Sequence, residues 1–144
     1  MADEVVINKA AVIERCVRRA REEYNQDPTT FTTNFTRQDA AILNVQRACE
    51  AALDMGQHWV RQARLGVPQS ARDVFELLAQ NNIIETDLAA NLKRMVAFRN
   101  IAVHDYQSVL TPILVSIITD HLDEFLQFSR ALILHTSQQK HPFQ

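Results

Sequence analysis

Residues 41–59 read AILNVQRACEAALDMGQHW, and their apolar side chains recur at a spacing that alternates between four and three. The members of this stripe are Ala41, Val45, Ala48, Ala52, Met55 and Trp59. Such spacing places them on one face of an α-helix, and the alanines allow a neighbouring helix to pack closely and nearly antiparallel. A second apolar flank widens this face and consists of Ile42, Cys49, Leu53 and Val60. The stretch therefore predicts a central helix that contacts neighbours on two sides.

The same periodicity, combined with signals for helix ends, extends outward to five helices. They are expected over residues 3–24, 36–65, 70–80, 86–103 and 111–134. Asp3 and Ser70 are predicted N-caps, Gly66 ends the central helix, and Pro112 occupies the favoured first position of the last helix. Because no strand pattern competes, residues 1–144 predict one all-α domain, a helical bundle of four long helices plus one short helix.

Three further segments bear on the fold and on the location of the protein. Residues 25–34 contain an Asp-Pro pair and several threonines, which is typical of a loop. Residues 136–144 are polar and are expected to form a frayed tail. The longest uncharged apolar run, residues 108–119, is too short to cross a bilayer, and the N-terminus lacks the features of a signal peptide. We therefore expect a cytoplasmic protein that makes no membrane contact.

Composition excludes several classes of site. The chain has 144 residues, enough to bury a core without disulfides or metal, and only two glycines, Gly56 and Gly66. A dinucleotide-binding turn or a P-loop needs several glycines close together, so neither is expected. Cys16 and Cys49 are predicted to be buried reduced thiols. No His, Asp and Glu set has close metal-ligand spacing, so neither a metal nor another cofactor is predicted.

Charge gives only a weak indication of a partner, because the formal net charge is −2. A basic cluster on the first helix consists of Arg15, Arg18, Arg19 and Arg21. It could contact phosphates. A solvated helix face is the preferred interpretation, since acidic neighbours allow pairs such as Arg18 with Glu22. Among the histidines, His121 is predicted to be a packed, hydrogen-bonded core residue, and His58 an edge residue rather than a ligand.

The helix expected over residues 86–103 contains an arginine at an apolar position. On a helical wheel Arg99 falls in the middle of one arc, together with Leu88, Leu92, Met95, Val96 and Val103. A guanidinium stays charged, and burying it without a partner is costly. Arg99 is therefore expected either to pair with a buried carboxylate, for example Asp54 or Glu50, or to line a cleft or an interface.

Residues 99–106 read RNIAVHDY and bring further chemistry to this helix. Arg99 and His104 lie about 140° apart on an ideal helix, so one continuous helix cannot present both on one face. Two geometries could still bring Arg99 and His104 together. The helix could end near Val103 so that His104 swings back, or it could pack beside its own copy in a two-fold homodimer, whose interface would include part of the apolar stripe.

The side chains of this run can act together on RNA. Arginine holds a phosphate and offsets charge in a phosphoryl transition state. Histidine exchanges a proton near neutral pH, and tyrosine hydrogen-bonds a phosphate or stacks on a base. Because RNA supplies its own 2′-OH as nucleophile, these groups suffice for cleavage without a metal, giving a 2′,3′-cyclic phosphate and a 5′-OH. Asp105 could tune the acidity of His104 or simply be a polar residue at a helix end.

The Arg-x4-His-x-Tyr run, Arg99 to Tyr106, resembles the signature of the HEPN superfamily and of its HepT-like toxins in particular, and Asn100 fits the pattern too. The helix order and the central helix with His58 also resemble these proteins, so the resemblance covers nearly the whole chain. It implies the toxin of a type VII HEPN/MNT toxin–antitoxin pair. The toxin would be a homodimer and a metal-independent endoribonuclease that cuts tRNA or mRNA.

Carried over by the resemblance, Arg99 and His104 are the catalytic residues and Asn100 orients the phosphate or the histidine. Tyr106 is the residue to which the MNT nucleotidyltransferase antitoxin transfers AMP from ATP, and the added charge and bulk would exclude RNA. Two alternatives stay open. One is a catalytically inactive HEPN dimer that binds a nucleotidyltransferase partner or a nucleotide. The other is an ordinary bundle in which Arg99 forms a buried salt bridge.

Overall fold

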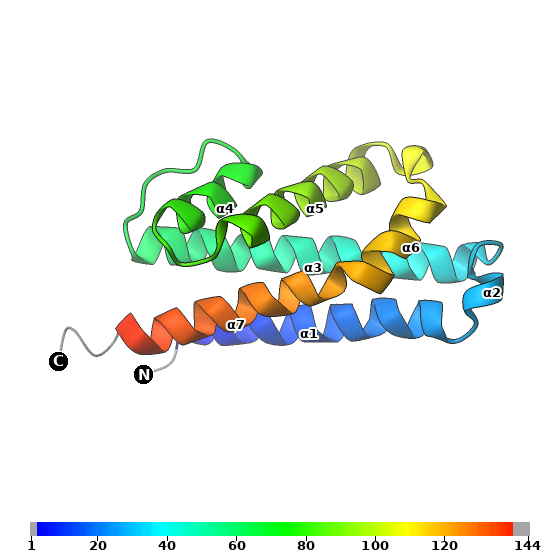
Figure 1. Ribbon diagram of the computed structural model, residues 1–144, viewed down its shortest axis with the longest axis horizontal. Coiled ribbons are helices and arrows are strands. Elements are labelled where there is room, and N and C mark those ends of the chain that lie inside the picture. The colour runs from blue at the N-terminus through cyan, green and yellow to red at the C-terminus, as the bar shows by residue number, and fades with distance from the viewer. Residues whose placement is uncertain (1–2, 140–144) are drawn as a thin grey trace.

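The computed structural model describes residues 3–139, and this part of the chain is an all-α bundle without a strand, as predicted (Figure 1). Its helices are α1 Glu4–Asn25, α2 Pro28–Phe31, α3 Phe35–Gln62, α4 Ala71–Gln80, α5 Thr86–His104, the 3-10 turn η1 Tyr106–Ser108, α6 Thr111–Asp120 and α7 Leu122–Gln139. None of the helices in these residues is long and apolar enough to span a membrane.

The central helix α3 organises the bundle. It runs beside α1 along most of its length, while α4 and α5 pack on another side and α7 crosses near α1 and α3 (Figure 1). All six members of the predicted apolar stripe are buried, as are Ile42, Cys49, Leu53 and Val60 of the second flank. The prediction of a central helix with neighbours on two sides is therefore confirmed.

Gly56 lets α4 approach α3 closely. A Cβ atom at this position would lie 2.7 Å from Cγ1 of Val74 and 3.4 Å from Leu78 Cδ1 and Phe128 Cζ. The helix α3 ends at Gln62, three residues earlier than expected, and Gly66 follows with φ +130°, a conformation that favours glycine. The chain turns here toward α4.

The helix caps follow the sequence at two predicted positions. The Asp3 carboxylate accepts hydrogen bonds from the backbone N–H groups of Val5, at 2.9 Å, and Val6, at 3.4 Å. The Ser70 hydroxyl accepts one from the backbone N–H of Asp73 at 3.2 Å. These bonds satisfy donors that have no partner inside the helix.

The helix expected over residues 111–134 is wrong in one respect, because it is broken at His121 into α6 and α7. The His121 backbone N–H still donates to Ile117 O at 2.9 Å, and its Nδ1 lies 3.0 Å from Glu124 Oε2 in the first turn of α7. The predicted hydrogen bond of His121 is confirmed. Its predicted place in the core is wrong, since 38% of its side chain is exposed.

Two expectations for irregular segments also need correction. The predicted loop at residues 25–34 contains the one-turn helix α2, which begins after an Asp27 cap and buries Phe31. The predicted frayed tail begins inside α7, which continues to Gln139, and Trp59 Nε1 donates to Thr136 Oγ1 at 2.9 Å. That bond ties the end of α7 to α3. Residues 140–144 of the predicted tail lie outside the described residues.

Candidate active site

The candidate site lies around the C-terminal half of α5 and the turn that follows it. Arg99 is half-buried there, and its guanidinium lies close to the thiol of Cys49 on α3. Burial raises the pKa of the Cys49 thiol to about 12, although the Arg99 charge acts in the opposite direction. The thiol therefore stays neutral near pH 7 and supplies no counter-charge to Arg99.

Arg99 has no acidic partner among the described residues. The two carboxylates proposed for a salt bridge are engaged elsewhere: Asp54 pairs with Lys9 at 3.1 Å, and Glu50 accepts a hydrogen bond from Gln46 at 3.4 Å. The Nε atom of Arg99 is buried and has no hydrogen-bond partner. No salt bridge to Arg99 forms among the described residues, and the salt-bridge interpretation is therefore wrong.

His104 is the last residue of α5 and is exposed, with Asp105 as the C-cap. The helix ends one residue beyond Val103, close to the expected point, but His104 is still helical and does not swing back toward Arg99. In one chain Arg99 and His104 therefore diverge by the roughly 140° of an ideal helix. Asn100 is exposed beside Arg99 and is free to contact a ligand from solvent.

Tyr106 stands on η1, just beyond α5, and 44% of it is exposed. Its hydroxyl donates a hydrogen bond to the carboxylate of Asp39 on α3. Partial burial first, and then the bond and charge of Asp39, raise the pKa of Tyr106 to about 12. The nearer carboxylate, Asp105, instead accepts from the Ser108 hydroxyl at 2.5 Å, which favours its interpretation as a polar residue at a helix end.

Sequence reasoning missed Asp39 and Cys49 as members of this site. Asp39 was visible only as an acidic residue near the start of the central helix, and nothing in its neighbourhood indicated Tyr106 as its partner. Cys49 was correctly predicted as a buried thiol, and it is free, as is Cys16. Its position against Arg99 follows from the packing of α5 on α3, which the sequence pattern does not specify.

An apolar surface flanks the candidate site. A groove of about 310 Å³ runs between α5, α6 and α7, with Phe98, Ile101, Ile113 and Ile117 among its lining residues. Two of its lining residues are exposed, Ile101 by 40% and Ile113 by 50%. Val103, which is 44% exposed, lies on the other side of α5 from Ile101. Val103, which the helical wheel places in the apolar arc around Arg99, is exposed, so this arc extends onto the surface of the single chain.

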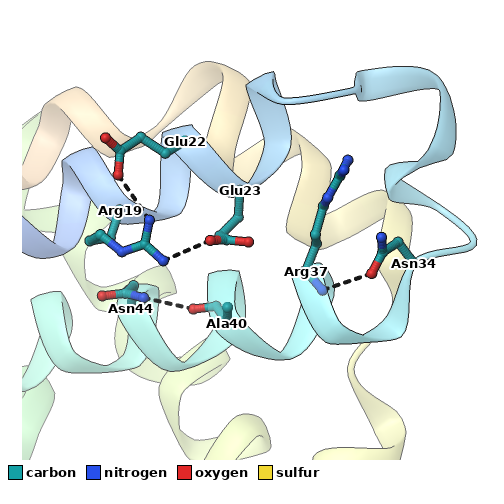
Figure 2. A network of polar contacts seen from close by, with 7 residues as sticks. All are labelled: Arg19, Glu22, Glu23, Asn34, Arg37, Ala40 and Asn44. Atoms are coloured by element: carbon teal, nitrogen blue, oxygen red, sulfur yellow. Dashed lines mark hydrogen bonds and ion pairs between the residues drawn. The ribbon is translucent and has the colours of Figure 1, made fainter.

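Two arginines of the basic cluster on α1 have structural partners. Figure 2 shows Arg19 of α1 between Glu22, at 2.9 Å, and Glu23, at 2.7 Å. Arg21 pairs with Asp123 of α7 at 2.6 Å. These contacts support the interpretation of the basic cluster as a solvated helix face. The expected Arg18–Glu22 pair is not the one that forms, because Glu22 is bound to Arg19.

The structure also shows the contact that His58 makes. His58 Nε2 lies 2.6 Å from the Asp3 carboxylate, which joins α3 to the start of α1. This contact agrees with an edge residue. Residues 3–139 contain no group of three or more His, Cys, Asp or Glu side chains that could hold a metal ion.

Comparison with known proteins places these residues in context. Residues 13–132 match the family described as Ribonuclease HepT-like. The chain is 51% identical over 126 residues to the mRNA nuclease HepT of Shewanella oneidensis, covering 88% of this chain and 94% of that protein.

Solved structures resemble the fold as closely. A tri-AMPylated Shewanella oneidensis HEPN toxin in complex with MNT antitoxin is 49% identical, with a TM-score of 0.86 over 90% of this chain and 97% of that chain. A toxin–antitoxin structure with AMP-PNP is 48% identical, with a TM-score of 0.87 over 90% and 98% of the two chains.

Proposed function

Because the chain belongs to the HepT-like family of HEPN proteins, we propose that it is a ribonuclease toxin neutralised by an MNT-type nucleotidyltransferase antitoxin. The observation that carries the proposal is Arg99. It is a half-buried arginine without an acidic partner, on the helix that ends in His104. Structural arginines at such depth are normally paired. An unpaired one is suited to an anionic ligand, and the scissile phosphate of RNA is such a ligand.

The residues then divide the cleavage step between them. His104 removes the proton from the ribose 2′-OH, whose oxygen attacks the adjacent phosphorus while the bond to the 5′-oxygen breaks. A protonated His104 returns a proton to that leaving oxygen. Arg99 holds the phosphate and stabilises the charge that develops on it, and Asn100 orients the phosphate or the histidine. The products carry a 2′,3′-cyclic phosphate and a 5′-OH, and no metal takes part.

A two-fold homodimer would bring Arg99 and His104 of different protomers together. If α5 packs beside its copy, the Arg99 of one protomer and the His104 of the other can face one groove. The exposed apolar side chain of Val103, which lies between Arg99 and His104 around the helix, supplies part of the surface that such packing would bury. The dimer thus accounts for both the motif geometry and the apolar stripe that reaches solvent.

Tyr106 is the proposed site of AMP transfer from ATP by the antitoxin. It lies two residues beyond His104 and is 44% exposed, so a second protein can reach its ring. Each AMP group adds a negative phosphate and a nucleoside beside His104. Those groups repel the RNA backbone and fill the space that RNA needs.

The test is RNA cleavage by the purified protein without its partner, in EDTA, with total tRNA and mRNA as substrates. Intact-mass measurement first establishes that Tyr106 carries no AMP. We expect wild type to cut RNA and His104→Ala to lose about 10²- to 10⁴-fold in rate, the usual contribution of acid–base catalysis. His135→Ala is the matched control, because it removes a histidine from the last part of α7, and the C-terminal end of that helix lies at the opposite end of the bundle from the end of α5 (Figure 1).

Two results would contradict the proposal. If unmodified dimeric wild type cuts no RNA across the panel, the chain is an inactive HEPN dimer that binds a nucleotidyltransferase or a nucleotide. If His104→Ala cuts as fast as wild type, the assigned acid–base residue is wrong even though the protein is a ribonuclease. Cleavage that requires added divalent metal would refute the metal-free step alone.

A further inference from the structure

The hydroxyl of Tyr106 is held by a residue far away in the sequence. It donates its proton to a hydrogen bond with Asp39, which lies 67 positions earlier, near the start of α3. The ring is 44% exposed, and Asp39 is exposed as well. The phenolic oxygen of Tyr106 is therefore held against α3, while the space around it stays open to a second protein.

A second contact fixes the same segment to α3. Thr111 Oγ1, at the start of α6, lies 3.5 Å from Gln38 Oε1, and Gln38 is buried and donates from Nε2 to Phe31 O at 2.8 Å. The chain from Tyr106 to Thr111 is thus attached at both ends to neighbouring residues of one helix turn. The position of the phenol is therefore set by tertiary structure and not by the flexibility of the turn.

The chemistry of tyrosine modification requires a proton acceptor. A phenol attacks phosphorus well only as its proton leaves, and with a pKa of about 12 the free phenolate is only about one part in 10⁵ at pH 7. The only hydrogen bond of the Tyr106 hydroxyl in the described part of the chain is the one to Asp39. Asp105 is nearer in sequence but is bound to Ser108.

We propose that Asp39 is the positioning residue for nucleotidyl transfer to Tyr106: it orients the hydroxyl and accepts its proton. The inference rests on the proposed function, in which Tyr106 is the target. In the step, the phenolic oxygen forms a bond to the α-phosphorus of ATP. The bond from that phosphorus to its bridging oxygen breaks, and pyrophosphate leaves with the bonding electron pair. The phenolic proton passes to Asp39 and from there to water.

The experiment measures AMP transfer to the intact protein by an MNT-type nucleotidyltransferase antitoxin, with Mg²⁺ and ATP. Intact mass reports AMP groups per chain against time for wild type, Asp39→Asn and Asp105→Asn. Asparagine keeps the size and polarity of aspartate but accepts no proton. Asp105→Asn is the matched control, because it removes an exposed carboxylate adjacent to Tyr106 in sequence. Thermal melting of all three proteins establishes that they are folded.

We expect Asp39→Asn to slow the first AMP transfer by about 10²-fold or more, the usual effect of removing a general base, while Asp105→Asn stays within about threefold of wild type. The pH profile separates this role from a structural one. In Asp39→Asn the rate should rise about tenfold per pH unit from pH 7 to 9, because the reaction then depends on the phenolate, whereas wild type should not.

The outcomes separate the inference from the function on which it rests. If wild type accepts AMP on Tyr106 and Asp39→Asn accepts it at the same rate, the role of Asp39 is refuted while the modification stands. If Asp39→Asn is slow but has the pH profile of wild type, Asp39 does not accept the proton, and the proposal is overturned in that part. If wild type itself accepts no AMP, or accepts it elsewhere, the proposed modification fails first. Replacement of Asp39 by glutamate should restore part of the rate, and no restoration would count against a proton acceptor.

Discussion

Replacing Arg99 by methionine separates a catalytic arginine from a structural one. Methionine keeps an unbranched side chain that can fill the space of the arginine stem, but it removes the guanidinium. If Arg99 belonged to a buried ion pair, its loss would leave a buried carboxylate alone and cost about 3 to 5 kcal/mol. The structure gives it no such partner, and its Nε atom is buried without a hydrogen bond.

The expected effect on stability follows from these contacts. A buried N–H without a partner costs the folded state about 1 to 3 kcal/mol, and the substitution removes that cost. Against this gain, the variant loses the favourable solvation of the guanidinium and some of its packing contacts. We therefore expect the free energy of unfolding to stay unchanged or to rise by about 1 kcal/mol, which raises Tm by about 0 to 4 °C for a chain of this size. Cleavage of RNA should nevertheless fall by about 10²- to 10³-fold, because a group that stabilises the transition-state charge is gone.

The assay combines thermal denaturation, followed by circular dichroism, with the rate of RNA cleavage. All melts use one protein concentration, because a dimer couples Tm to concentration. Arg130→Met is the matched control, since Arg130 is exposed on α7 and forms no ion pair within residues 3–139. It should leave the free energy of unfolding within about 0.5 kcal/mol of wild type. A fall in Tm of more than about 6 °C for Arg99→Met, or cleavage at the wild-type rate, would refute the reasoning.

Two further predictions concern the packing and the tyrosine. Gly56→Ala should lower the free energy of unfolding, measured by urea denaturation, by about 1 to 2 kcal/mol. The new Cβ would lie 2.7 Å from Val74 Cγ1, and the cost of overpacking exceeds the gain in helix propensity. A raised midpoint of urea denaturation would contradict this. In a Tyr24→Phe background, absorbance at 295 nm should titrate Tyr106 with a pKa of about 12. Since this pKa is raised in the folded state, its stabilising contribution is complete below pH 10, the ordinary tyrosine value, and is lost between pH 10 and 12. A midpoint near 10 would show that the bond to Asp39 is absent in solution.

The sequence predicted the helices well where one face of a helix is buried along its whole length. For α3 the apolar spacing, the small residues and the glycine-proline ending each indicated a long central helix. The break at His121 escaped prediction because apolar side chains continue at helical spacing on both sides of it. Only the turn geometry of His121, with its Nδ1 atom 3.0 Å from Glu124, separates α6 from α7.

The sequence also identified Arg99, because a guanidinium in the middle of an apolar arc conflicts with burial. It left two explanations, a salt bridge or a ligand site, and could not choose between them. The choice depends on where carboxylates 45 and 49 positions away point after folding. Asp54 is turned toward Lys9 on α1, away from the helix that carries Arg99. The orientation of the Asp54 side chain depends on how three helices pack together, and no local sequence pattern specifies it.

Asp39 is a second residue whose role no local sequence pattern could reveal. The run from Arg99 to Tyr106 contains the groups proposed to meet RNA and AMP, so a contiguous motif reveals them. The group proposed to take the proton of Tyr106 comes from another helix, because the carboxylate within the motif, Asp105, is bound to the Ser108 hydroxyl. Once AMP is attached, the tyrosine oxygen has no proton to donate, and the new phosphate and the Asp39 carboxylate repel each other. Modification should then release Tyr106 from α3 and direct the AMP away from that helix, and the residue that prepares the tyrosine for transfer would thereby also help to expel its product.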